Sequence, residues 1–274
     1  MTHEAGLKNP MELAWNEAAH GYDAYFGPRF APYLGAAIGA LLARSSELPA
    51  GAVLVPCAGP GRELVPLARA FAERRIVASD LSGEMVQLAR ERCASFGNVS
   101  VERADATALG APNGGAAALL SVFGLQLLPR QPETLASWLG LLRPSGVAVI
   151  VYWPRNTETS GPFQTMHRLL RESSLVDGPW ESELVPSAIA VGSRVLTDTR
   201  IGFEMRHDDA STAWHALTRL GPLRGLALSR GQAFVDELGA RFLADFSEGP
   251  ITHTPEARLL VIERHQTSRP AESD

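Results

Sequence analysis

The chain has 274 residues and a formal net charge of −5, with 45% hydrophobic and 20% charged residues. This composition provides enough apolar material for a sizeable core and excludes a chain that is disordered throughout. The acidic balance disfavours sequence-independent nucleic-acid binding, for which a basic face must neutralise the phosphates.

Several other classes of protein are disfavoured by the absence of their sequence signals. No apolar stretch is long enough to span a bilayer, and no signal peptide is visible at the N-terminus. Two cysteines, Cys57 and Cys93, cannot form a disulfide scaffold, although a single bridge between them stays open. Because neither CxxC nor HxxxH nor HExxH spacing occurs, we expect no metal site. We therefore expect a cytoplasmic protein without a membrane partner.

In chain order, residues 10–48 predict two helices, the second over residues 32–44, and residues 1–48 form an expected helical cap. Short apolar runs then alternate with helical segments. This alternation predicts βαβ units, a parallel sheet and right-handed crossovers. The expected strands cover residues 52–56, 76–79, 99–103, 116–122 and 147–153, and the expected helices cover residues 63–74, 83–96 and 133–142.

Residues 155–200 interrupt this alternation, because they are rich in proline, serine and threonine. We interpret them as a lid insertion that contains one helix, over residues 162–173. Closing elements are expected over residues 201–265, followed by a flexible tail at residues 266–274. The closing elements are a strand near residues 203–207, helices over residues 211–220 and 232–246, and a final strand over residues 258–264.

A turn of small residues joins the first expected strand to the helix that follows it. Gly59 and Gly61 lack a Cβ atom, so a ligand can approach the backbone closely, and the helix N-terminus offers free N–H groups. Leu64 stands where a dinucleotide-binding GxGxxG motif requires glycine or alanine, and no Walker A ending is present. The turn therefore favours a ligand that is held without a pyrophosphate.

Two acidic residues follow the next two expected strands. Asp80 ends the second strand, where a carboxylate can accept hydrogen bonds from two ribose hydroxyls. Asp105 follows the third strand, where it can accept a hydrogen bond from an adenine amine. The turn and both acids should face one crevice at the C-terminal edge of the sheet. A plain strand–helix connection and a simple helix cap remain the alternatives for these features.

Five segments in this order resemble the motifs of class I S-adenosylmethionine-dependent methyltransferases, in the small-molecule group that includes quinone-biosynthesis enzymes. They are VLVPCAGPG, IVASDLSGEMVQLAR, RADATAL, AAALLSVFGLQLL and LLRPSGVAVIVYW. The resemblance covers residues 50–154, the expected cofactor-binding core of a single domain over residues 1–274. It implies a Rossmann-like, doubly wound α/β sheet of about seven mostly parallel strands, with an antiparallel last strand.

The resemblance also implies which residues contact the cofactor, S-adenosylmethionine. Asp80 should bind the ribose, Asp105 the adenine amine, and Gly59 and Gly61 the methionine portion. The other cofactor residues implied are Cys57, Ala58, Leu81, Met85, Ala106 and Val122.

Two positions depart from the family pattern. An acid is usual where Val55 stands, and a glycine is usual where Cys57 stands. The missing acid removes a partner of the cofactor's ammonium group. Tyr22 or Tyr25 could compensate, but packing of the N-terminal helix onto the core explains these tyrosines equally well.

The acceptor and the catalytic groups lie outside the motifs. His167 and His215 are candidate bases by residue type, although packed or surface histidines explain them more simply. An apolar set predicts a small, partly hydrophobic or aromatic acceptor, and the alternative is that these residues form the core of the lid. The set comprises Phe123, Gln126, Trp153, Met166 and Trp180.

The expected activity is in-line transfer of a methyl group from the cofactor to this acceptor. A cofactor-binding protein that does not methylate, either a cyclase or a scaffold, is the first alternative. A nicotinamide-dependent oxidoreductase is a weaker one, as is a methyltransferase that acts on nucleic acid.

Overall fold

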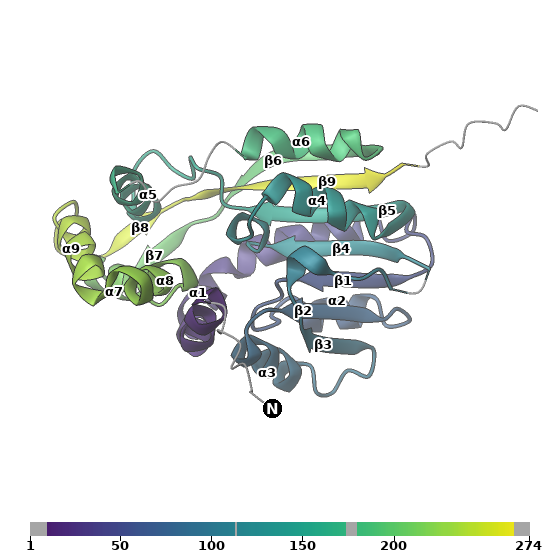
Figure 1. Cartoon of the computed structure of the whole chain (residues 1–274), viewed down its shortest axis with the longest axis horizontal. Helices are drawn as coiled ribbons and strands as arrows, with labels where there is room; N and C mark the ends of the chain where they lie inside the picture. The colour runs from purple at the N-terminus through teal and green to yellow at the C-terminus, as the bar shows by residue number, and fades with distance from the viewer. Residues whose placement is uncertain (1–9, 113, 174–179, 266–274) are drawn as a thin grey trace, which may run out of the picture.

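A computed structural model describes residues 10–112, 114–173 and 180–265. Seven strands form one sheet in the order β3-β2-β1-β4-β5-β9-β6, in which only β9 runs antiparallel to its neighbours (Figure 1). The predicted mostly parallel sheet with an antiparallel last strand is therefore confirmed. The strands are β1 (Ala52–Pro56), β2 (Ile76–Asp80), β3 (Val99–Arg103), β4 (Ala116–Val122), β5 (Leu142–Tyr152), β6 (Ser193–Gly202) and β9 (Glu256–Arg264).

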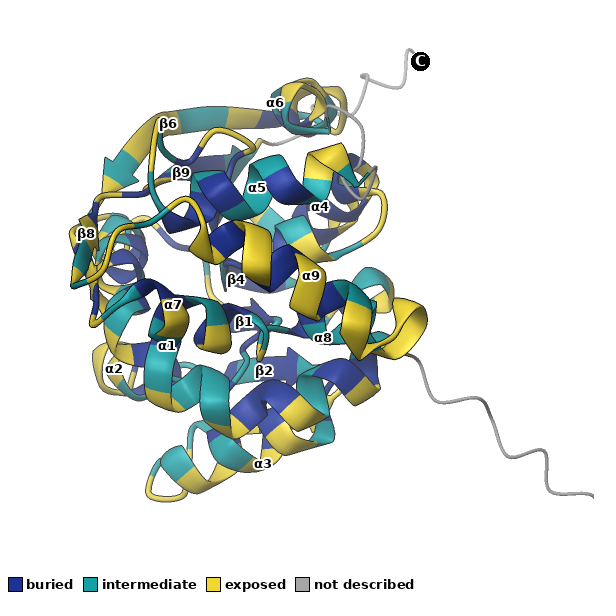
Figure 2. Ribbon diagram, turned by 90° about the vertical axis from the view of Figure 1, so that its left-hand side faces the viewer, coloured by how far each residue is buried: buried dark blue, intermediate teal, exposed yellow. Residues whose placement is uncertain are grey.

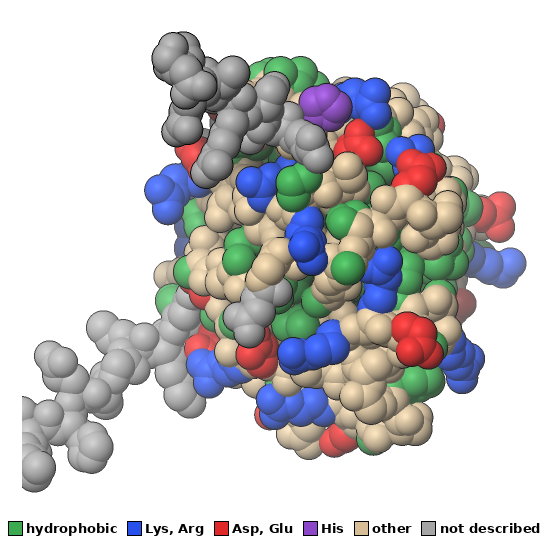
Figure 3. Space-filling model, turned by 90° about the vertical axis from the view of Figure 1, so that its right-hand side faces the viewer, with side chains coloured by type: hydrophobic (Ala, Val, Ile, Leu, Met, Phe, Trp, Pro, Cys, Tyr) green, Lys and Arg blue, Asp and Glu red, His purple; other side chains and the backbone are tan. Residues whose placement is uncertain are grey.

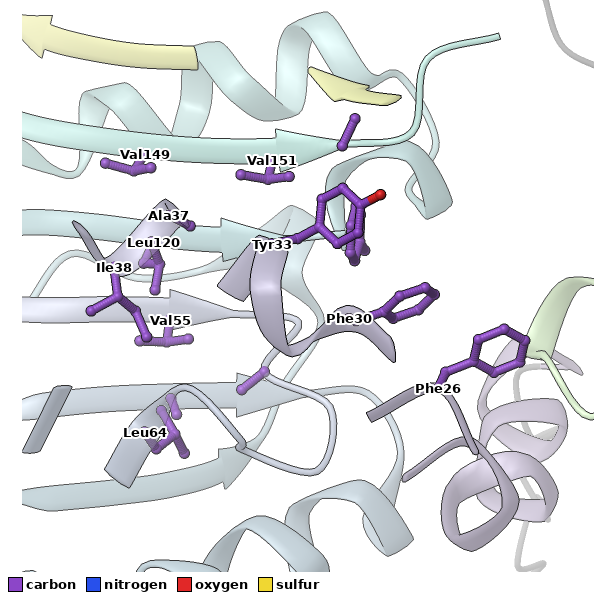
Figure 4. Packing of buried hydrophobic residues seen from close by; sticks show 14 of the residues in the cluster. Phe26, Phe30, Tyr33, Ala37, Ile38, Val55, Leu64, Leu120, Val149 and Val151 are labelled. Atoms are coloured by element: carbon purple, nitrogen blue, oxygen red, sulfur yellow. The ribbon is translucent and has the colours of Figure 1, made fainter. Parts of the chain in front are cut away.

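The central strands are apolar because helices cover both faces of the sheet. Alternate side chains of β1, β4 and β5 enter two separate clusters, one on each face. Val55, Leu120 and Val149 belong to the cluster beneath the N-terminal helix (Figure 4). The helices nearest the sheet are α2 (Leu64–Ala70), α3 (Gly83–Arg92), α4 (Gln131–Gly140) and α6 (Glu181–Ala190).

The N-terminal cap is one long helix, α1 (Pro10–Leu42), so the expectation of two helices is wrong. Pro28 and Pro32 lie inside α1 and are both exposed. Phe26, Phe30 and Tyr33 are buried on the opposite side of the same turns (Figure 4). Because this aromatic stripe packs against the core, it holds the helix together across the hydrogen bonds that the prolines cannot make.

A group of helices lies at the C-terminal ends of the parallel strands, next to α1 (Figures 1 and 2). A short antiparallel ribbon, β7–β8, connects this group to the sheet. The segments are α5 (Pro162–Glu172), α7 (Ala210–Leu217), α8 (Gly221–Arg230), α9 (Gln232–Leu243), β7 (Met205–His207) and β8 (Ile251–His253).

The segment that we interpreted as a lid, residues 155–200, contains elements of two kinds. α5 lies among the helices at the strand ends, whereas α6 packs against α4 and β6 pairs with β9 along the sheet. Neither α6 nor β6 was predicted. β6 is largely exposed because it is an edge strand, so it lacks the apolar run that marks the central strands.

The described residues carry few features of the classes that the sequence disfavours. No helix among them is long and apolar enough to cross a membrane. Cys57 and Cys93 are both free, so the bridge that the sequence left open is not formed. On the face at the N-terminal ends of the parallel strands, basic and acidic side chains are interspersed (Figure 3).

Candidate active site

The turn of residues 57–63, here called the glycine turn, follows β1 and leads into α2. Cys57, Gly59 and Gly61 have φ angles of 55°, 51° and 71°, in the left-handed region that favours glycine. A Cβ atom at Gly61 would lie 2.8 Å from the Ala89 Cβ atom, so Gly61 allows α3 to pack closely. A Cβ atom at Gly59 would meet no other atom within 4 Å. The backbone at Gly59 is therefore open to a ligand.

Asp80 is fixed beside this open backbone at the end of β2. Its Oδ2 atom accepts a hydrogen bond from the Gly59 N–H at 2.8 Å, and its Oδ1 atom accepts one from the Ser82 N–H at 3.0 Å. Burial raises the pKa of the Asp80 carboxyl group, and these backbone donors oppose that shift. Because each carboxylate oxygen can accept a second bond, the Asp80 side chain remains able to bind two hydroxyl groups.

Asp105 follows β3 and caps a short 3-10 helix, Ala106–Ala108. Its Oδ1 atom accepts hydrogen bonds from the Thr107 N–H at 2.8 Å and from the Thr107 hydroxyl at 2.7 Å. The capping alternative is thus realised, but it uses one oxygen only. Burial raises the pKa of the Cys57 thiol, and the charges of Asp80 and Asp105 raise it further. The turn and the two acids therefore lie within electrostatic reach of one another, as predicted.

A cavity of about 40 Å³ lies between the glycine turn, α1 and the end of β4, and is here called the turn cavity. The sequence missed four of the residues that line it, Phe30, Leu34, Arg62 and Glu63. The predicted residues that line it are Tyr22, Cys57, Ala58, Gly59, Val122 and Phe123.

The remaining predicted cofactor residues do not line the turn cavity. Leu81 is half-buried beside Asp80, and Gly61 faces α3. Met85 is buried in the first turn of α3, where its N–H donates to the Ser82 hydroxyl at 3.2 Å. Ala106 is also buried, and its carbonyl accepts a hydrogen bond from the Trp138 ring N–H at 2.7 Å.

Ion pairs hold α1 over the glycine turn. Asp23 of α1 accepts from Arg62 at 2.6 Å and from Arg92 at 2.7 Å. The Ser82 hydroxyl donates to Oδ1 of Asn16, also on α1, at 2.7 Å. The sequence could not reveal these contacts, because each joins residues that are far apart in the chain.

Glu63 is the least expected member of the cavity wall, since the sequence analysis placed it in the amphipathic helix that follows the turn. It is only 6% exposed. Burial raises its carboxyl pKa to about 7, and the charge of Asp80 adds to this shift. Burial also raises the pKa of the Tyr22 hydroxyl, with a further contribution from the Glu63 charge. Tyr22 and Glu63 therefore face each other across the turn cavity.

Most of the predicted acceptor residues lie in one aromatic cluster. Phe123 and Trp153 stack with ring centroids 4.3 Å apart, and Phe163 lies 5.2 Å from Trp153. Met166 packs against the same cluster. Trp180, by contrast, contacts Tyr152 in the cluster on the opposite face of the sheet.

Gln126 lies just beyond β4, in the 3-10 helix Leu125–Leu127. Its Oε1 atom is buried and has no hydrogen-bond partner among the described residues. Gln126 does not line the turn cavity.

Neither histidine candidate lines the turn cavity. His167 lies in α5, where burial lowers its pKa. His215 is exposed at the edge of a separate depression of about 250 Å³ between α1 and the helices α7, α8 and α9. The structure therefore brings neither of them to the glycine turn.

A buried chain of hydrogen bonds, which the sequence did not predict, runs from α1 to the loop after β5. The Tyr25 hydroxyl lies 2.6 Å from His207 Nδ1, and His207 Nε2 lies 2.9 Å from His253 Nε2. His253 Nδ1 then lies 2.6 Å from Glu158 Oε2. Tyr25 is thus engaged with His207, which leaves Tyr22 as the only one of the two candidate tyrosines that lines the turn cavity.

Comparisons with known proteins agree with this geometry. Residues 53–146 match a family described as a methyltransferase domain. The chain is 32% identical over 212 residues to trans-aconitate 2-methyltransferase of Azoarcus sp. (strain BH72), a match that covers 71% of this chain and 79% of that relative.

Solved structures share the fold at low sequence identity. The YcgJ protein of Bacillus subtilis aligns with a TM-score of 0.57 and 15% identity, over 85% of this chain and 99% of its own. The [4+2]-cyclase SpnF aligns with a TM-score of 0.52 and 16% identity, over 83% of this chain and 80% of its own.

The matching domain covers β1 to β5, including the glycine turn, Asp80 and Asp105. The curated relative shares sequence over most of both chains. The chain therefore belongs to the class I S-adenosylmethionine-dependent methyltransferases.

Proposed function

We propose that this protein transfers a methyl group from S-adenosylmethionine to a small, partly hydrophobic or aromatic acceptor. One observation carries the proposal: the buried Asp80 carboxylate is held beside the open backbone of Gly59 by hydrogen bonds from Gly59 and Ser82. Such an arrangement fits a ligand that presents two adjacent hydroxyls to Asp80 and an extended chain to the glycine turn.

Each part of the cofactor would then have its own contact. Asp80 would accept hydrogen bonds from the ribose hydroxyls. Asp105 would use the oxygen that does not cap the 3-10 helix to accept one from the adenine amine. Val122 and Phe123 line the turn cavity at the end of β4, where they would lie beneath the sulfonium.

Bound S-adenosylmethionine supplies an electrophilic methyl group on a positively charged sulfur. The acceptor atom forms a bond to the methyl carbon as the carbon–sulfur bond breaks, and S-adenosylhomocysteine remains. For this step the protein aligns acceptor and methyl group and excludes water.

The proposed acceptor class follows from the wall of the turn cavity. Phe30, Leu34, Val122 and Phe123 supply an apolar surface beside the glycine turn. A carboxylate acceptor, such as the trans-aconitate in the name of the curated relative, would need a free cation there. Arg62 is the cationic residue of this wall, and Asp23 neutralises it. An apolar or aromatic acceptor therefore fits this wall better than a carboxylate.

The test is an acceptor screen with methyl-labelled S-adenosylmethionine. The screen should include small aromatic and aliphatic compounds with hydroxyl, amine or activated carbon atoms, together with di- and tricarboxylates. We expect labelled product from the first group, formed in a one-to-one ratio with S-adenosylhomocysteine. Labelling of carboxylates alone would overturn the acceptor class. Tight cofactor binding without any labelled product would favour the cyclase or scaffold alternative.

A further inference from the structure

Glu63 presents a buried carboxyl group to the turn cavity and has no cationic partner in the protein. It is 6% exposed, and it lines the cavity together with Gly59 and Tyr22. No arginine or histidine within the described ranges forms an ion pair with it. Since burying an unpaired carboxylate is costly, a site of this kind is completed by a cation that arrives with a ligand.

The nearby arginines are already paired with another residue. Arg62 and Arg92 both form ion pairs with Asp23 of α1, at 2.6 and 2.7 Å. Arg92 still lowers the pKa of Glu63 through its charge, but burial has the larger effect. The two cations closest to Glu63 therefore contribute to docking α1.

Helix capping does not account for Glu63 either. It occupies the N-cap position of α2, yet its side chain makes no capping hydrogen bond. The family's usual acid is also missing from β1, where Val55 is 1% exposed within the apolar core. Glu63 is thus an acid close to the glycine turn, in a chain that lacks the customary one.

We propose that Glu63 binds the α-ammonium group of the methionine portion of S-adenosylmethionine. The inference rests on the proposed function, because it requires the cofactor to lie along the glycine turn. An ammonium group beside Glu63 would complete the missing ion pair in a site shielded from water. Tyr22, which the sequence offered as a substitute for the missing acid, would then shield this pair from water.

The surroundings of Glu63 predict how binding depends on pH. Its pKa of about 7 results chiefly from burial. Because the ammonium group binds the ionised carboxylate, affinity should rise as pH increases from 6 to 8. The titratable and charged groups around Glu63 are Tyr22, Asp23, Arg62, Asp80, Arg92 and Cys93.

Two ligands separate Glu63 from the rest of the site. S-adenosylhomocysteine carries the α-ammonium group, whereas 5′-methylthioadenosine keeps the adenosine and the thioether but has no amino acid portion. Calorimetry with both should be run on the wild-type protein, on Glu63→Gln and on Glu73→Gln. Glu73 is an exposed acid soon after α2, so Glu73→Gln is the matched control.

We expect Glu63→Gln to weaken S-adenosylhomocysteine binding at pH 8 at least about tenfold, as expected for a lost charge-assisted hydrogen bond. Affinity for 5′-methylthioadenosine should change less than about twofold, and Glu73→Gln should match the wild type with both ligands. The rise in S-adenosylhomocysteine affinity between pH 6 and 8 should be present in the wild type and absent in Glu63→Gln.

Equal losses of both ligands in Glu63→Gln, or no loss of either, would overturn the role of Glu63 and leave the proposed function standing. If the wild type binds neither ligand, the proposed function itself fails. Should Glu63→Gln fold poorly, the wild type alone still provides a test. Its affinity must rise with pH for S-adenosylhomocysteine and not for 5′-methylthioadenosine, and equal pH profiles would contradict the proposal.

Discussion

Gly59 and Gly61 have similar left-handed backbones but face different surroundings. A Cβ atom at Gly61 would press against Ala89 and Leu64, whereas one at Gly59 would point into open space. The two glycines of the motif therefore have different tasks, since Gly61 allows the helices to pack and Gly59 admits a ligand.

This difference predicts different outcomes for two alanine substitutions. Gly61→Ala should lower the free energy of unfolding by roughly 2–4 kcal/mol, because it combines backbone strain with overpacking. Gly59→Ala should cost roughly 1 kcal/mol from strain alone but should abolish detectable S-adenosylhomocysteine binding. Urea unfolding and calorimetry on both variants measure the two effects. Equal losses of stability would contradict the assignment.

At this scale the sequence was informative where a residue type has few alternatives. The glycine turn, Asp80 and the Ser82 cap of α3 were all found from local patterns, and the cap is confirmed by the Met85 N–H bond to the Ser82 hydroxyl. Glu63 was missed because acids are common near the start of a helix. Only the packing of α1 against the turn shows that this acid is buried.

At the scale of elements, α1 is tied to the core by a few polar contacts. Asp23 bridges Arg62 of the glycine turn and Arg92 near the end of α3. Asp23→Ala should therefore loosen this part of α1, because two partly buried arginines lose their partner. We expect a loss of roughly 1–3 kcal/mol in stability and faster proteolysis within α1. Glu17→Ala, at an exposed pair on the same helix, is the control and should have little effect.

The hydrogen-bond chain from Tyr25 to Glu158 makes folding sensitive to acid. Burial, with the charges of His253 and Arg29, lowers the pKa of His207 to about 4, below its ordinary value of 6.5. Between these two values the unfolded chain binds a proton that the folded one does not, so stability falls as pH decreases from about 6.5 to 4. The loss from this group should be roughly 1–2 kcal/mol.

Urea unfolding as a function of pH checks this expectation. His207→Gln should be less stable than the wild type at pH 7, but its stability should fall less steeply between pH 6.5 and 4. Parallel curves for the two proteins would show that another group causes the acid sensitivity.

The elements that the sequence predicted are those with a strong local signal. The bounds of β1, β3 and β4 coincide with the predicted runs, because buried parallel strands are continuously apolar. β6 lacked that signal, since it is an exposed edge strand that is recognisable only by its pairing with β9. α1 was divided in two because its prolines break the local pattern, while its buried aromatic side chains restore the helix.

For the whole molecule, the sequence analysis predicted the sheet architecture better than the additions to it. The order of the motifs fixed the parallel core, and the resemblance supplied the antiparallel last strand. The interpretation of residues 155–200 as a lid was limited by composition alone. That segment includes α6 and most of β6, which pack along the sheet, so the proposed lid is better assigned to α5 together with α7, α8 and α9.

Ligand binding should stabilise the molecule as a whole. At a concentration one hundred times its dissociation constant, S-adenosylhomocysteine adds about 2.7 kcal/mol to the free energy of unfolding. For a chain of this length we expect a rise of roughly 5–10 °C in Tm. NADH should give no shift, because Leu64 fills the position that a dinucleotide-binding turn leaves to glycine. A larger shift with NADH would support the oxidoreductase alternative.

The central claim is that Asp80 and the glycine turn together bind S-adenosylmethionine. The most direct measurement is calorimetry of S-adenosylhomocysteine with the wild type and with Asp80→Asn, which keeps the shape of the side chain but removes its charge and one acceptor. We predict binding by the wild type and a loss of at least about thirtyfold in the variant, with Tm changed little. No binding by the wild type at millimolar ligand, or unchanged affinity in Asp80→Asn, would contradict the claim.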